Sequence, residues 1–221
     1  MNTGKQLFLL LTFLSSSFIA AAQNTVLQPL SKAQQDCLKK EIDIMVANDQ
    51  KYRWMLMYGE TDEQKLKELR RMSEQDQSVR MQQAMANKVG ITQAVKDSLW
   101  KLQVHIDSAN FNRLSAILYK YGVPHSIMPG DVSLIFDHTP DMITDDLLAL
   151  LKQEVQDKHF PGLDYAIIYD GLQIYRKLPE LYHVTKYYNT TTKTATIKQP
   201  EDLEATNKAR KEIGLKRLKK Q

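Results

Sequence analysis

The sequence has only one cysteine, Cys37, among its 221 residues. An internal disulfide is therefore excluded, and the fold must be held together by its apolar core. Several catalytic signatures are also missing: the chain has no Gly-x-Ser-x-Gly elbow, no glycine-rich phosphate loop, and no His-x-x-x-His or His-Glu-x-x-His metal spacing. Because Cys37 lies in a helical pattern with no histidine placed near it, we interpret it as a small buried or idle thiol. We expect neither a metal nor a cofactor.

The chain also lacks a strong excess of one charge, since it has 30 Lys and Arg residues and 26 Asp and Glu residues. This balance gives no reason to expect a nucleic-acid partner. Hydrophobic residues make up 43% of the chain, which is enough to build a core without disulfide or metal staples. The composition therefore predicts one compact domain.

The N-terminus has the pattern of a secretory signal peptide. Lys5 is its lone charge, an apolar stretch runs from Leu7 to about Phe18, and small residues follow at Ala20 to Ala22. Ser15 to Ser17 cut this stretch short of the roughly 20 apolar residues that a membrane span needs. No cysteine follows to carry a lipid. We predict cleavage after Ala22, a mature chain of residues 23–221 and a secreted or periplasmic protein with no permanent membrane anchor.

The first part of the mature chain predicts long helices. Ser31 with Gln34 forms a capping box, and a stripe at helical spacing follows, formed by Leu38, Ile42, Met45, Asp49 and Tyr52. Gly59 ends this helix, and the pattern predicts a second, highly polar helix from Thr61 through Met85. Another stripe, from Leu99 to Tyr121, ends at the Tyr-Gly-Val-Pro sequence at Tyr121–Pro124.

The second part of the chain mixes helices with one hairpin. The segment from Gly130 to Pro140 suits either a short buried helix or a buried strand, whereas Thr144 begins an amphipathic helix that ends near His159. Asp164, as a cap, favours a helix for the next segment. Tyr- and Thr-rich sequence from Leu181 to Lys198 predicts a hairpin that turns at about Asn189 to Thr192. A last helix follows Pro200 and ends near Gly214. The fold class is therefore mainly α, a multi-helix single domain with a small C-terminal β-hairpin.

Two pairs of polar residues stand on the apolar stripes. Asp49 lies one helical turn before Arg53, and Asp107 lies one turn before Asn110, so the two members of each pair can share a helix face. These residues can meet in a buried network that binds a small ligand, or they can pair with one another and fix the register of the helices. We favour the structural network and keep Asp49, Arg53 and Asn110 as candidate ligand-binding residues.

An ordered set of residues resembles a family of bacterial proteins of unknown function. The set consists of Asp49-Gln50-x-x-Arg53, Asp107-x-x-Asn110, Tyr121-Gly122-Val123-Pro124, Gly130, His138, Tyr165-Ala166, Asp170, Pro179 to Tyr182, Arg210 and Gly214-Leu215. The family typically shows Tyr-Gly-Trp-Pro, Gln-His-Ala-Asp, Asp-Arg and Tyr-Gly-Thr-Gln motifs and an Arg-x-x-x-Gly-Leu ending. The resemblance spans about Leu30 to Leu218. It implies no activity, and it adds Tyr182 to the candidate ligand-binding residues.

This chain is a divergent member by that comparison. The chain has Val123 at the tryptophan, Asp137 at the glutamine, Thr139-Pro140 at Ala-Asp, Gly171 at the arginine, Glu180 at a glutamine, and His183-Val184-Thr185 at Gly-Thr-Gln. If the pattern builds a site, its Asp and His members remain while most amide and guanidinium donors are lost. Recognition of a substrate would then be altered or lost.

His138 allows two interpretations. It can act as a general base oriented by a carboxylate, with Asp107 and Asp170 as candidate catalytic partners, or it can be a structural histidine bonded to a carbonyl or an acid. The basic tail at 208–221 is interpreted as a solvated helix end rather than a contact with an anionic surface. We therefore predict an exported binding or interaction module of the cell envelope, whose partner is an envelope protein or a small ligand. The alternative is a hydrolase-like or degenerate enzyme that uses His138.

Overall fold

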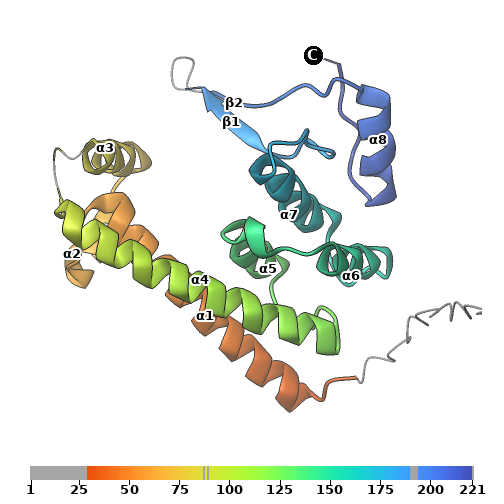
Figure 1. Ribbon diagram of the computed structural model, residues 1–221, viewed down its shortest axis with the longest axis horizontal. Coiled ribbons are helices and arrows are strands. Elements are labelled where there is room, and N and C mark those ends of the chain that lie inside the picture. Colours follow the sequence, from red (N-terminus) through yellow and green to blue (C-terminus); the bar gives the residue numbers. More distant parts are fainter. Residues whose placement is uncertain (1–28, 87, 89, 190–193, 221) are drawn as a thin grey trace, which may run out of the picture.

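The computed structural model describes residues 29–86, 88, 90–189 and 194–220 (Figure 1). The expected signal peptide and most of the expected hairpin turn lie outside these residues. Within them the chain forms eight α-helices, one 3₁₀ turn and one antiparallel hairpin, which confirms the mainly α fold with a small C-terminal hairpin. In chain order the elements are α1 (Lys32–Tyr58), α2 (Glu63–Leu69), α3 (Glu74–Met85), α4 (Gln93–Tyr121), α5 (Pro129–Asp137), η1 (Pro140–Met142), α6 (Asp145–Gln156), α7 (Gly162–Tyr175), β1 (Lys186–Asn189), β2 (Thr194–Ile197) and α8 (Leu203–Glu212).

Helices α1 and α4 lie side by side and form the long axis of the molecule (Figure 1). The predicted capping box is present at the start of α1, where the Ser31 and Gln34 side chains each accept from the other's backbone N–H. At the end of α1, Gly59 takes a left-handed conformation with φ of 60°, which glycine adopts without steric cost. The two helices run antiparallel, because the start of α1 packs with the end of α4.

The prediction of a single helix from Thr61 through Met85 is wrong, because this stretch forms two helices, α2 and α3. Ser73 begins the second helix, because its hydroxyl accepts from the backbone N–H of Asp76. The Gln77 side chain then donates to the carbonyls of Arg70 and Met72, which the end of α2 leaves free. A local cap thus overrides a polar periodicity that continues through the break.

Helices α5, α6 and α7 pack at the other end of the long pair, and α8 lies at the far side of α7 with the hairpin (Figure 1). The ambiguous segment from Gly130 is the helix α5. The segment after Pro161 is the helix α7, as expected, but Asp164 is not its cap. Asp164 lies in the first turn and accepts a hydrogen bond of 2.9 Å from the Ser133 hydroxyl of α5. Asp164 therefore links α5 to α7 and does not cap α7.

The apolar core falls into two clusters along the α1–α4 pair. The larger one gathers the first half of α1, the second half of α4 and the apolar faces of α5, α6 and α7, and it includes Leu38, Leu114 and Phe136. The smaller one joins the last turns of α1 to α2 and the start of α4, and it includes Met55 and Leu99. Buried polar residues of both helices lie between the two clusters.

Two further features bear on location and chemistry. No helix in the described part of the chain is both long and apolar enough to cross a membrane. The sole cysteine, Cys37, is exposed on α1.

Candidate functional site

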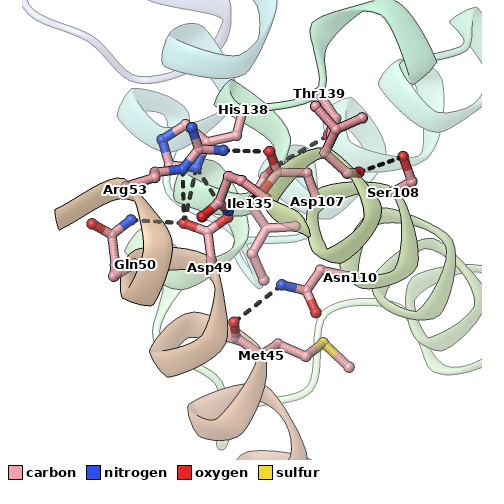
Figure 2. Close-up of polar contacts among 12 residues, drawn as sticks. Met45, Asp49, Gln50, Arg53, Asp107, Ser108, Asn110, Ile135, His138 and Thr139 are labelled. Atoms are coloured by element: carbon pink, nitrogen blue, oxygen red, sulfur yellow. Dashed lines mark hydrogen bonds and ion pairs between the residues drawn. The ribbon is translucent and has the colours of Figure 1, made fainter. Parts of the chain in front are cut away.

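His138 meets a carboxylate from a distant helix. Its Nδ1 lies 2.9 Å from Oδ2 and 3.1 Å from Oδ1 of Asp49, so the first residue after α5 is bonded to the middle of α1 (Figure 2). Asp49 is fully buried, and the His138 side chain is 19% exposed. A carboxylate on Nδ1 fixes the orientation and the tautomer of the ring.

Arg53 connects Asp49 with a second acid. Its Nη2 lies 2.6 Å from Oδ2 of Asp107 on α4, and its Nε lies 3.6 Å from Oδ2 of Asp49 (Figure 2). The other oxygen of Asp107 accepts a bond of 2.6 Å from Gln103, one turn earlier on α4. The expected pairing of Asp49 with Arg53 is thus present, and the two polar stripes do meet. We call Asp49, Arg53, Gln103, Asp107 and His138 the polar layer.

The two acids of the polar layer respond differently to their surroundings. Burial raises the pKa of Asp49, but the hydrogen bond and charge of His138, together with Arg53 and Gln50, outweigh it and hold that pKa below its ordinary value of 3.8. For Asp107 burial is the larger effect, and the neighbouring charge of Asp49 adds to it. The pKa of Asp107 is therefore raised, although Gln103 and Arg53 both donate to its carboxylate.

Asn110 lies one helical turn from Asp107 and supports the same helix pair. Its side-chain amide donates a bond of 3.1 Å to the backbone carbonyl of Met45 on α1 (Figure 2). Asn110 therefore fastens α4 to α1 through the backbone of α1, and among the described residues it has no hydrogen bond to the side chains of the polar layer.

Asp170 and Tyr182, the other candidates, lie in a separate arrangement. The buried Asp170 carboxylate accepts backbone N–H groups from Leu181, Tyr182 and Val184, at 2.9 to 3.1 Å. Burial raises the pKa of Asp170, and these three donors oppose that rise. Among the described residues, the hydrogen bonds of Asp170 all go to this loop and none to His138. The structure therefore gives Asp170 the role of holding the loop after α7.

Helix α8 holds the same loop through the backbone carbonyl of Tyr182. The Arg210 guanidinium donates to the backbone oxygens of Tyr182 and Lys216, and the Tyr182 ring packs edge-on against Tyr165 and Tyr169. Tyr182 is almost fully buried. Its contacts make it a core residue that fixes the loop.

The same loop borders a cavity of about 600 Å³ between the end of α7, the hairpin and the start of α8. Glu180 lies in its wall and is 9% exposed. Its Oε1 accepts a bond of 2.6 Å from the Tyr187 hydroxyl, whereas its buried Oε2 has no hydrogen-bond partner among the described residues. His183, also in the wall, has φ of 49°, a left-handed conformation that is unfavourable for a side chain with a Cβ.

Sequence reasoning missed three members of these sites. Gln103 carried no signal, because glutamine is common on exposed helix faces. Glu180 and His183 were singled out only as departures from the resembling pattern. The glycine of that pattern coincides with the left-handed position of His183, which was the one available signal that this backbone conformation is required.

These observations define a mainly helical protein with a buried polar layer between two apolar clusters and a separate cavity near its C-terminus. The chain belongs to a family of unknown function (DUF6624), whose family model matches residues 62–221. The membership expected from the sequence is thereby confirmed, although the match begins later than Leu30. Asp107, His138, Asp170 and Glu180 lie inside the matched part, while Asp49 and Arg53 precede it. Comparisons with curated proteins and with solved structures gave no match.

Proposed function

We propose that this protein is an exported binding module of the cell envelope, and that it binds a small ligand in the cavity beside Glu180. The observation that carries the proposal is the contrast between the two polar sites. In the polar layer the charged groups form ion pairs with one another, although Nε of Arg53 and Oε1 of Gln103 have no hydrogen-bond partner among the described residues. In the cavity wall the unpartnered atom is an oxygen of the Glu180 carboxylate, for which the described residues supply no ion pair. The volume of the cavity, about 600 Å³, falls within the range of roughly 300–1,000 Å³ that is usual for small-molecule sites.

The polar layer serves a structural role in this proposal. Asp49, Arg53 and Asp107 lie between two apolar clusters, so sliding α1 against α4 by one turn would place these charges against apolar side chains. Buried polar groups are known to fix the register of paired helices in this way. The layer holds the scaffold, and binding is left to the cavity at the other end of the chain.

A small-molecule screen by thermal shift on residues 23–221 tests the proposal. Ala205 lines the cavity on α8 and is exposed, so Ala205→Trp should fill the cavity and abolish every specific shift. Lys208→Trp, on the same helix but outside the cavity wall, is the matched control and should keep the hits. A screen without hits, or hits that survive Ala205→Trp, would refute a ligand site here. Export is tested separately, by the presence of a chain that begins at Gln23 outside the cytoplasm.

The alternative is a hydrolase-like enzyme, and the His138–Asp49 pair is the observation that favours it. Asp49 holds Nδ1 of His138, and no hydrogen bond among the described residues involves Nε2, which leaves a nitrogen able to accept a proton. Turnover of a panel of activated esters that is lost in His138→Gln would support this alternative. Equal background rates for the wild type and His138→Gln would support the binding module.

A further inference from the structure

Glu180 carries a local free-energy cost that the fold itself does not compensate. A buried carboxylate normally has partners for both oxygens, and here the described chain supplies one, the hydroxyl of Tyr187. His183, in the same wall, adds a left-handed backbone. Local costs of this kind persist in proteins mainly where binding or catalysis uses them. Lys177, also in the wall, has a left-handed φ of 59° as well. Together these features at one cavity indicate a site that is completed by another molecule.

The chemistry of the wall sets what that molecule carries. Oε2 of Glu180 can only accept, so its missing partner is a hydrogen-bond donor, and a cationic donor gives the strongest bond to a carboxylate. Glu201 and Asp202 add negative charge to the same wall, and Lys177 and Lys198 add positive charge. All four of these residues are exposed, whereas the Glu180 carboxylate is buried.

The remaining wall suits an apolar body behind that donor. Ile174 and Leu178, from the end of α7, are 42% and 52% exposed and line the cavity together with the Tyr187 ring. Apolar residues around one precisely charged contact are the usual composition of a small-molecule site. We propose that the cavity binds a small organic cation, an ammonium or guanidinium group on an apolar body, with Glu180 as its counter-ion. This inference rests on the proposed function and names its ligand class.

Tyr187 already holds one oxygen of the Glu180 carboxylate. Oε2 is screened from solvent, and the Tyr187 hydroxyl occupies Oε1, but the tyrosine side chain is 43% exposed at the edge of the hairpin. The bond to Glu180 also raises the pKa of Tyr187 to about 12. A cation that bonds Oε2 therefore shares the carboxylate with the Tyr187 phenol, which bonds Oε1.

Three matched probes test the ligand class by thermal shift and calorimetry on residues 23–221. Phenethylamine, which is cationic at neutral pH, should give a saturable shift at millimolar concentration, whereas 2-phenylethanol should bind at least about tenfold more weakly. 3-Phenylpropanoate should not bind. Equal binding of the three probes, or no binding of phenethylamine at millimolar concentration, would overturn the inference.

Variants locate the contact. Glu180→Gln keeps the shape of the side chain and should weaken phenethylamine binding at least about tenfold, whereas Glu204→Gln, on the exposed face of α8, should leave it unchanged. Tyr187→Phe removes the hydroxyl that shares the carboxylate, which leaves more negative charge for the cation, and should tighten binding by about tenfold. Binding that is insensitive to Glu180→Gln would refute the role of Glu180. If the library hits blocked by Ala205→Trp turn out to be neutral or anionic, the cavity remains a ligand site and only the ligand class is wrong.

Discussion

Replacing Arg53 with methionine tests whether the polar layer is a single electrostatic unit. Arg53→Met keeps an unbranched side chain of similar length but removes the one permanent cation between two buried acids. Asp49 is then left with His138 and Gln50, and Asp107 with Gln103. The side chains of Asp49 and Asp107 are 0% and 8% exposed, so water cannot replace the guanidinium.

The expected effect is large because the partners of the lost charge stay buried. Removing one member of a buried ion pair costs about 3–5 kcal/mol. In a domain of this size each kcal/mol lowers Tm by roughly 2–4 °C, so the loss corresponds to about 6–20 °C. Asp107→Asn added to Arg53→Met should recover part of the lost stability, since it removes a buried negative charge that no longer faces a cation.

Arg113→Met is the matched control for this experiment. Arg113 also joins α4 to α1, through an ion pair with Glu41, but its side chain is 52% exposed and that of Glu41 is 35% exposed. An exposed pair contributes at most about 1 kcal/mol. Thermal and urea unfolding of residues 23–221 should therefore separate the two variants clearly. Equal losses of stability would refute the view that burial makes the polar layer important.

Three other predictions concern single carboxyl groups. The pKa of Asp49 is lower in the folded chain than its ordinary 3.8, so its stabilisation is present above pH 3.8 and is lost as the pH falls through the folded pKa; Asp49→Asn should flatten this acid limb in a plot of Tm against pH, and an unchanged limb would contradict the assignment. Without ligand, Glu180→Gln should stabilise the fold by about 1–3 kcal/mol, because it removes a charge with an unpartnered oxygen; a lower Tm would mean that the carboxylate is structural. Asp170→Asn should cost about 1–3 kcal/mol and speed amide exchange at Leu181 and Val184, which donate to its carboxylate; unchanged exchange would argue against a loop-holding role.

Local sequence patterns were enough to predict most of the helices that form the scaffold. The Ser31–Gln34 capping box and the apolar stripe of α1 depend on residues three or four positions apart, and such patterns are legible in one sequence. The same stripe placed Asp49 on a buried face, from which its pairing with Arg53 followed. The break between α2 and α3 was missed because the Ser73 cap is weak in sequence against a polar pattern that runs through it.

The partners of the candidate site residues depend on tertiary packing. His138 was singled out from its residue type and a resemblance, but nothing local states that it reaches Asp49, 89 positions earlier. Asp170 binds backbone N–H groups, which every residue except proline carries and which therefore leave no trace in a side-chain pattern. The burial of Glu180 depends on how the hairpin and α8 fold over the end of α7, and no periodicity encodes that arrangement.

The position of the polar layer also has a consequence for the way the molecule opens. Because charged residues separate the two apolar clusters, the small cluster of Met55 and Leu99 shares little apolar surface with the large one. Packing of that kind divides a protein into cooperative units that unfold at different free energies. The end formed by α2, α3 and the adjoining turns of α1 and α4 should thus form a foldon of its own, which opens while the cavity beside α7, the hairpin and α8 remains folded and able to bind.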